Sequence, residues 1–319
     1  MKSRYLASFV MVCAALTAGA QTTVLNDSFS SDSLNPGSYV NPTSTSTTWE
    51  TIANKTTVTS SLSSGLNLGT ASTGSVVEAA ALFTTSPITL AASGDYVRLT
   101  FTFSGTGIAT SNGYVLTGLF NSHGTTPLTG LTNYTSATFS GGTAGWTGYN
   151  VGMAVVSGSS STKMFARPTQ TALTANNQDL IYGGLGSAYT LPVQIGTSNS
   201  TKPSLTDSTV YTATFDVSLN SSLASVTTYN LYTGASATGT PILTGTGTQA
   251  SGTATTIFDS FALGFYNKAS ASSAINYSSV SVSTNVALAP VPEPATYALL
   301  AGLATLGFVA VRRSRARTA

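Results

Sequence analysis

The carboxylates of this chain could do acid–base chemistry, but they are spaced too far apart to form a recognisable pair. Between residues 21 and 289 the chain has two glutamates, Glu50 and Glu78, and neither has another carboxylate within five residues. Glycosidases need a nucleophile and a general acid close together on either side of the scissile bond. The sequence therefore predicts a protein that is not an enzyme, unless the fold buries Glu50 or Glu78 in a cleft facing a second acid.

Other groups that could act as nucleophiles or bind transition metals are equally sparse. His123 is the only histidine, and its setting in Asn121-Ser122-His123-Gly124 predicts a surface turn. The G-x-S-x-G pattern of many serine hydrolases is absent from the sequence. Zinc sites need several histidine or cysteine ligands. We therefore expect neither a serine hydrolase nor a zinc protein.

Three aspartates raise the question of a calcium site. Calcium takes several oxygen ligands, and Asp27, Asp32 and Asp259 could converge if the first and last strands pair. No D-x-D-x-D loop supports such a site, and the simpler interpretation places all three at the solvated surface. Calcium is the only cofactor that the sequence suggests.

Exposed aromatic rings could bind sugars by stacking on pyranose faces. Trp49 and Trp146 are the only tryptophans, and Trp146 lies in a glycine-rich stretch, residues 141–149. This setting predicts a loop in which Trp146 and Tyr149 contact a glycan. The alternative is that Trp146 packs down over the edge of the fold.

The composition excludes nucleic acid as an expected partner. The full chain has a formal net charge of +2, but residues 21–289 hold six basic and nine acidic side chains, a net charge of −3. No basic patch is present to neutralise phosphates. Charged residues are only 7% of the chain, whereas disordered chains usually combine high charge with low hydrophobicity. We expect a folded body whose surface is wetted by hydroxyl groups.

Alternating apolar and polar residues predict β-strands throughout this body. From Val97 to Phe103 every second residue is apolar, which is typical of a strand with one buried face. Residues 210–219 repeat the pattern, and residues 225–232 follow a short Asn220-Ser221-Ser222 turn, which predicts an antiparallel hairpin. Further strands are predicted at residues 24–29, 76–83, 114–120, 149–156, 257–266 and 275–282.

Many antiparallel strands with polar connections predict an all-β fold, an antiparallel β-sandwich of the jelly-roll type over residues 21–289. Residues 157–203 are less regular, and we expect a long loop there. Asn26-Asp27-Ser28-Phe29 near the start, together with residues 258–265 and 275–280 near the end, resembles the concanavalin-A-like (laminin-G-like) jelly roll. The resemblance implies that the opening strand pairs with the final strand, and such folds commonly bind sugars.

The N-terminus has the features of a secretory signal peptide. Lys2 and Arg4 precede an apolar run over residues 5–16, which is too short for a stable membrane span. Ala18-Gly19-Ala20 offers small residues to signal peptidase, so we expect residues 1–20 to be removed and Gln21 to begin the mature chain. Cys13 follows Val12, where a lipobox needs a small residue, and we interpret it as an apolar residue of the signal.

The C-terminus has the features of a short membrane anchor. Residues 295–311 carry no charge, and as a helix they would span about 25 Å, a marginal length for a bilayer. The cluster that follows predicts a cytoplasmic end by the positive-inside rule; it comprises Arg312, Arg313, Arg315 and Arg317. Pro292-Glu293-Pro294 immediately precedes the apolar segment and excludes regular secondary structure there.

This order of tripeptide, apolar segment and arginine cluster over residues 290–319 resembles the PEP-CTERM sorting signal of Gram-negative bacteria. The resemblance implies an exosortase as a partner, which would process the tail. It also implies export through the inner membrane, transient anchoring by one C-terminal helix, and a final location at the cell surface or outside the cell.

For the body, the sequence favours a non-catalytic cell-surface or extracellular-matrix protein associated with exopolysaccharide. A lectin-type carbohydrate-binding module is the first alternative. A glycan-processing enzyme is disfavoured because of the carboxylate spacing, and a subunit of an adhesin or filament is a further option.

Overall fold

A computed structural model describes residues 20–36, 38–53, 58–126, 132–133, 143, 145–154, 161–169, 180–181, 193–269 and 271–288. The chain divides into two compact units, Met1–Val286 and Ala287–Ala319, and the elements below belong to the first. Of the predicted signal peptide, only Ala20 is described, and the sorting tripeptide, the predicted helix at 295–311 and the arginine cluster lie outside the described residues. Within the described ranges, no helix is long and apolar enough to cross a membrane.

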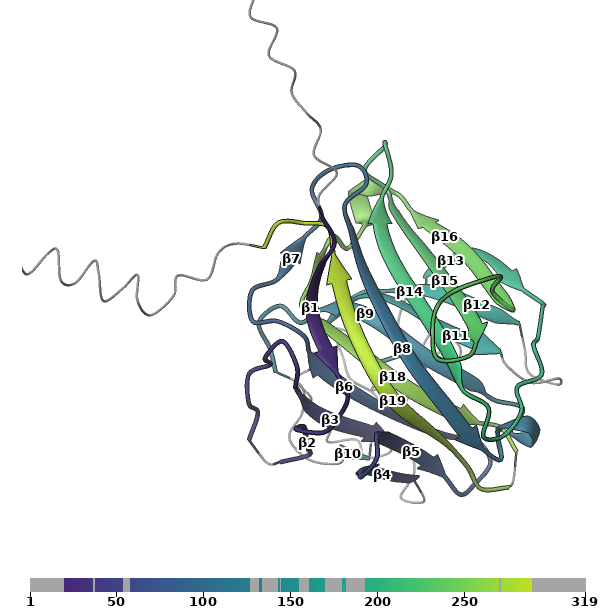
Figure 1. Ribbon diagram of the computed structural model, residues 1–319. Helices are drawn as coiled ribbons and strands as arrows, with labels where there is room; N and C mark the ends of the chain where they lie inside the picture. The colour runs from purple at the N-terminus through teal and green to yellow at the C-terminus, as the bar shows by residue number, and fades with distance from the viewer. Residues whose placement is uncertain are drawn as a thin grey trace, which may run out of the picture. The chain divides into compact units, whose positions relative to one another are not determined.

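Two β-sheets lie one over the other in this unit (Figure 1). In the first, which we call sheet 1, the described strands run in the order β16-β15-β14-β8-β19-β5-β4, with β1 added on β19. All of its pairings are antiparallel. Its strands are β1 (Thr22–Asp27), β4 (Val58–Leu62), β5 (Leu66–Thr70), β8 (Tyr96–Thr106), β14 (Tyr211–Leu219), β15 (Ser225–Thr233), β16 (Leu243–Gln249) and β19 (Ser273–Thr284).

Sheet 2 has the order β10-β3-β6-β18-β9-β11-β12-β13, with β2 added on β3. The short strands β2 and β10 pair with β3 in parallel, and the other pairings are antiparallel. Its strands are β2 (Ser33–Leu34), β3 (Thr48–Ala53), β6 (Ser75–Leu82), β9 (Tyr114–Asn121), β10 (Thr132–Asn133), β11 (Thr147–Ala154), β12 (Thr162–Arg167), β13 (Val193–Asn199) and β18 (Ser260–Asn267). A separate small ladder joins β7 (Ile88–Thr89) to β17 (Ile257–Phe258).

The main hydrophobic core lies between the two sheets, where alternate residues of each strand meet. On β8, the apolar residues from Val97 to Phe103 are fully buried, as the alternation predicted. On β14, Phe215 and Val217 point into the same core. Burying side chains of this size contributes roughly 1.5–3 kcal/mol each. The prediction of an all-β sandwich is therefore confirmed, and its core is made by the period-two pattern.

The hairpin predicted around Asn220 is present. β14 and β15 pair from Tyr211↔Thr233 to Leu219↔Ser225. Between them, the Asn220 side chain accepts hydrogen bonds from the Ser222 and Ala224 amides (2.9 and 3.1 Å). An asparagine that bonds its own turn in this way fixes the chain reversal.

The first and last strands also pair as predicted, because β1 runs antiparallel to β19 from Thr22↔Thr284 to Asp27↔Val280. The two ends of the folded unit therefore lie side by side (Figure 1). The finer assignment to a concanavalin-A-like jelly roll stays a prediction.

The prediction of a long loop over residues 157–203 is wrong in part. β12 and β13 fall within this range and extend sheet 2. Met164, Ala166 and Ile195 from these strands are buried in the main core. Only a few inward positions on each strand are apolar, so the signal was too short to stand out from a glycine- and asparagine-rich stretch.

The described end of sheet 2 at β13 approaches β16 of sheet 1. Gly196 on β13 has φ +73°, a backbone conformation that glycine adopts freely. A Cβ at this position would lie 2.4 Å from the Thr246 carbonyl oxygen on β16. The absence of a side chain at Gly196 is what lets the two strands come this close.

Candidate functional site

The fold brings together the two glutamates that are far apart in sequence. Glu50 on β3 pairs with Ala80 on β6, and Ile52 pairs with Glu78. Because directly paired residues and residues two apart share a face, Glu50 and Glu78 are diagonal neighbours on one face of sheet 2. Both side chains are fully buried. This pairing could not be predicted from sequence, because it depends on the register of β3 against β6.

The Glu78 carboxylate is hydrogen-bonded to backbone amides and is not exposed to solvent. Its carboxylate accepts hydrogen bonds from the Leu180 amide (2.7 Å) and the Ile181 amide (3.2 Å). Asn150 on the same face donates to the Ile181 carbonyl, and Arg167 donates to the Trp146 carbonyl. These polar side chains therefore tie Trp146 and the 180–181 segment to sheet 2.

The same face carries a second hydrophobic cluster that buries this polar group. It lies on the side of sheet 2 opposite the main core, and it includes Ile52, Val76, Ala80, Leu82, Tyr114, Leu116, Phe120, Trp146, Ala154, Leu180, Ile181 and Ala262. From the sequence, we expected an enzyme only if Glu50 or Glu78 were buried in a cleft facing a second acid. The structure places the two acids on one face, where Glu78 accepts hydrogen bonds from the Leu180 and Ile181 amides. In this arrangement Glu78 positions the chain.

The expectation that Trp146 and Tyr149 offer exposed rings to a glycan is wrong for this structure. Both side chains are fully buried. Trp146 packs against Phe120 at 6.3 Å between ring centroids and donates from its indole nitrogen to the Thr125 hydroxyl at 2.9 Å. Trp146 therefore packs down on the fold, as the alternative held, but against β9 in the interior of sheet 2 and not over an edge.

Tyr149 is buried because β11 directs it into the main core between the sheets. Its hydroxyl accepts a hydrogen bond from the Thr255 amide at 2.9 Å. Burial raises the pKa of Tyr149 to about 12. The ring therefore acts as a core residue with one satisfied polar atom.

Of the three aspartates considered for calcium, the structure brings together two. Asp27 and Asp32 interact through their carboxyl groups. Asp259 instead accepts hydrogen bonds from the amide and the hydroxyl of Ser122, both at 2.7 Å. Within the described residues, no group of three acidic, histidine or cysteine side chains could hold a metal ion. A calcium site formed by all three aspartates is therefore not observed in this part of the chain.

His123 lies in an exposed turn after β9, as predicted. Its φ is +52°, and its amide donates to the Asn121 side chain at 2.9 Å. The imidazole Nε2 lies 3.1 Å from the Thr147 hydroxyl. Among the described residues, the Thr147 hydroxyl is the one hydrogen-bond partner of the imidazole ring, and no carboxylate is paired with the ring.

The open face of sheet 1 carries an array of polar side chains. We call it the hydroxyl face and define it by two rows that run across β19, β8, β14, β15 and β16. One row is Ser281, Thr100, Thr214, Asn230 and Thr244. The other is Ser283, Arg98, Asp216, Thr228 and Thr246.

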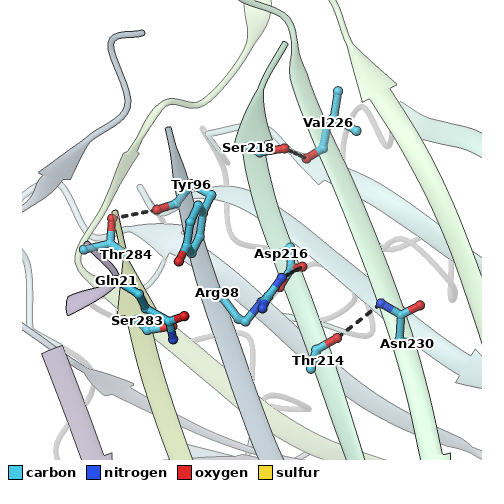
Figure 2. A network of polar contacts seen from close by, with 10 residues as sticks. All are labelled: Gln21, Tyr96, Arg98, Thr214, Asp216, Ser218, Val226, Asn230, Ser283 and Thr284. Carbon is cyan, nitrogen blue, oxygen red and sulfur yellow. Dashed lines mark hydrogen bonds and ion pairs between the residues drawn. The ribbon is translucent and has the colours of Figure 1, made fainter. Parts of the chain in front are cut away.

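One ion pair lies in the middle of this face (Figure 2). Arg98 donates to both carboxylate oxygens of Asp216 at 2.8 Å, and its guanidinium carbon lies 5.6 Å from the centre of the Tyr96 ring. The hydrogen bonds to Asp216 raise the pKa of Arg98 above its usual value. The pair cancels its own charge, so the hydroxyl face is close to neutral.

Hydrogen bonds along the rows hold the smaller side chains in place. Asn230 donates to the Thr214 hydroxyl at 3.4 Å, and its carbonyl oxygen accepts from Thr244 at 2.7 Å; Figure 2 shows the first of these contacts. Hydroxyl and amide groups on such a surface can both donate and accept. The arrangement suits an uncharged, polyhydroxylated ligand better than an ion.

Residues 290–314 match the family model described as the PEP-CTERM protein-sorting motif. The match covers the C-terminal tail and leaves the β-sandwich unassigned. No curated protein matches the chain.

Solved structures with a similar arrangement include three polysaccharide lyases and several lectins. Peanut lectin has 11% identity and a TM-score of 0.39, with 76% of this chain and 93% of that chain covered. The PL-14 alginate lyase from Aplysia kurodai has 11% identity and a TM-score of 0.40, covering 73% and 87%. An endo-β-1,4-glucuronan lyase from Trichoderma reesei has 8% identity and a TM-score of 0.36, covering 73% and 86%. Likeness at this level assigns neither an activity nor a ligand to this chain.

Proposed function

We propose that this chain is an exported, non-catalytic protein of the cell surface or extracellular matrix, and that an exosortase processes its tail. The observation that carries the proposal is the PEP-CTERM motif at residues 290–314, which begins just after the compact unit that ends at Val286. The last strand of the sandwich, β19, ends at Thr284. Processing of the tail would therefore leave every described strand of the sandwich intact.

Replacing Pro292, Glu293 and Pro294 together by alanine tests this proposal. We expect the wild-type protein to leave the membrane fraction with a shortened C-terminus, and the triple variant to stay in that fraction with its tail uncut. Cell fractionation and mass spectrometry of the C-terminal peptide measure both outcomes. Leu288→Ala, a change at an exposed position before the motif, is the matched control and should behave as wild type. The same compartment and C-terminus for the triple variant and wild type would refute exosortase processing.

The hydroxyl face supports a second role for the folded unit, binding of a neutral polysaccharide in the manner of a lectin. Its two rows present hydroxyl and amide groups around a self-neutralised ion pair. The net charge of −3 over residues 21–289 disfavours a polysaccharide of uronic acids. Association with exopolysaccharide would follow from many such contacts along the rows.

Lysine substitutions on the hydroxyl face test this role. Thr228→Lys combined with Thr246→Lys places two long, charged side chains across one row, and we expect binding to an insoluble neutral polysaccharide to fall at least tenfold. Ser236→Lys combined with Thr238→Lys adds the same charge at exposed loop positions and should leave binding unchanged. Equal binding by the double variant and the control would exclude this face as the contact surface.

A further inference from the structure

A small pocket opens between the end of β9, the start of β11 and the segment that leads into β17. It is lined by Asn121, His123, Thr147 and residues 254–257, and we call it the histidine pocket. Its volume is about 200 Å³, whereas pockets that hold drug-sized ligands measure roughly 300–1,000 Å³. The histidine pocket therefore suits one small unit of a ligand rather than a long segment.

The first wall of the pocket is the turn that carries His123, the only histidine in the chain. The His123 backbone is left-handed, with φ +52°, and its amide donates to the Asn121 side chain at 2.9 Å. Ser122 is fastened to the buried Asp259 by its amide and its hydroxyl. The imidazole Nε2 lies 3.1 Å from the Thr147 hydroxyl. These contacts fix the place of an exposed imidazole.

Strand pairing brings the parts of this wall together from distant stretches of the chain. Asn121, the last residue of β9, pairs with Thr147, the first residue of β11. Trp146 comes just before Thr147; its ring packs against Phe120, and its indole nitrogen donates to the Thr125 hydroxyl at 2.9 Å. The turn is therefore tied to the start of β11 on both sides of His123.

The second wall, residues 254–257, is held by its backbone. The Thr255 amide donates to the Tyr149 hydroxyl at 2.9 Å. The Thr256 carbonyl accepts from the Leu90 amide at 2.8 Å. Both walls are thus fixed before a ligand enters, and a site that is ordered in advance loses less entropy on binding.

The residues that line the pocket combine uncharged hydrogen-bonding groups with a small apolar surface. The imidazole, the Asn121 amide and the threonine hydroxyls donate and accept hydrogen bonds. Ile257 adds an apolar side chain that is 36% exposed. No aspartate, glutamate, lysine or arginine is among the described residues that line the pocket. A hexose matches this combination, because it carries hydroxyl groups around its rim and C–H groups on its faces.

We propose that the histidine pocket binds one hexose unit of a neutral glycan. The His123 imidazole and the Thr147 hydroxyl would hydrogen-bond to neighbouring hydroxyl groups of the sugar, and Ile257 would contact its C–H groups. The pocket shares no residue with the hydroxyl face of sheet 1. It is a second site, and it does not depend on the role proposed for that face.

NMR signals of the imidazole test the proposal directly, because His123 is the only histidine. Untagged full-length protein, labelled at histidine, is titrated with the methyl glycosides of glucose, galactose and mannose. We expect at least one glycoside to shift the imidazole signals saturably, with a dissociation constant on the order of 1 mM. The absence of a saturable shift with all three, up to about 50 mM, would overturn the proposal. A shift caused by inorganic phosphate and by none of the glycosides would overturn it as well.

Thr147→Val removes one hydroxyl and keeps the size of the side chain. We expect the glycoside to bind roughly threefold to tenfold more weakly, the loss typical of one hydrogen bond. The matched control is Thr244→Val, which removes a hydroxyl from the hydroxyl face and should leave the dissociation constant unchanged. Wild-type affinity in Thr147→Val, or the same weakening in Thr244→Val, would contradict binding in the histidine pocket.

The two glycan proposals can fail separately. Thr228→Lys combined with Thr246→Lys changes the hydroxyl face alone, so the shift of the His123 signals by the glycoside should be the same as in wild type. Loss of that shift in the lysine variant would place the glycoside on the hydroxyl face and refute the histidine pocket. Polysaccharide binding that the lysines leave unchanged would refute the role of the hydroxyl face and leave the histidine pocket standing.

Discussion

At the scale of single residues, the polar groups buried in this protein mostly hold the chain together. Glu78 accepts from the Leu180 and Ile181 amides, and Asp259 accepts twice from Ser122. A buried carboxylate bonded in this way is stabilised by its donors and leaves them unsatisfied when it is removed. The non-catalytic role proposed for Glu78 can therefore be tested by what its loss does to local structure.

Glu78→Ala should destabilise the attachment of residues 180–181 to sheet 2. Two buried amides lose their acceptor, and we expect the free energy of unfolding to fall by about 2–4 kcal/mol. Urea denaturation measures this loss. Glu78→Gln keeps one acceptor oxygen and should lose about half as much. If either variant instead abolished hydrolysis or cleavage of a glycan by an otherwise active protein, a catalytic role would replace the structural one.

Tyr149 makes a separate prediction about alkaline pH. Its pKa is raised from 10.0 to about 12 by burial, so its contribution to stability is fully present below pH 10 and is lost as the pH rises through 12. We expect part of the tyrosine absorbance change near 295 nm to appear only when the protein unfolds. Tyr149→Phe should reduce that late part of the titration, whereas a titration identical to wild type would show that Tyr149 ionises with the exposed phenols.

At the scale of elements, the sequence predicted the strands that have one buried face and one open face. β8 and β14 show this pattern, and their bounds were close to the prediction. β3 was not predicted: all six of its residues are buried, but only three are apolar, whereas the equally buried β6 and β9 have longer apolar runs and were predicted. A strand covered on both sides loses the alternation that marks it in sequence.

The candidate sites depend on register, which the sequence does not contain. Glu50 and Glu78 meet only because Ile52 pairs with Glu78. The glycines around Trp146 predicted an exposed loop. In the structure the Trp146 ring is buried, because it packs against Phe120 and donates a hydrogen bond to the Thr125 hydroxyl. The pairing of β1 with β19 could be predicted, because residues at both ends carried a recognisable pattern.

Gly196 tests how the strands β13 and β16 approach one another. Gly196→Ala puts a methyl group against the Thr246 carbonyl and requires an unfavourable φ. We expect a loss of about 1–3 kcal/mol in the free energy of unfolding, measured by thermal or urea denaturation. Gly239→Ala has a similar positive φ but open space around it, and it should cost less. An equal cost for the two variants would show that backbone strain alone, rather than close approach, governs Gly196.

At the scale of the whole molecule, the charges separate by role. The folded body is slightly negative, and six of the twelve basic residues lie in the first four or the last eight residues. The first and last strands of the folded body, β1 and β19, pair with each other. The sorting motif follows as a separate segment, residues 290–314. This division explains how one chain could carry both export signals and a neutral, hydroxyl-rich surface.

The mass of the C-terminal peptide, measured on wild-type protein recovered outside the inner membrane, tests the central claim most directly. Exosortase processing predicts that this protein lacks the arginine cluster, Arg312 to Arg317, while the sandwich through Thr284 is intact. Recovery of the exported protein with an uncut C-terminus at Ala319 would contradict the account.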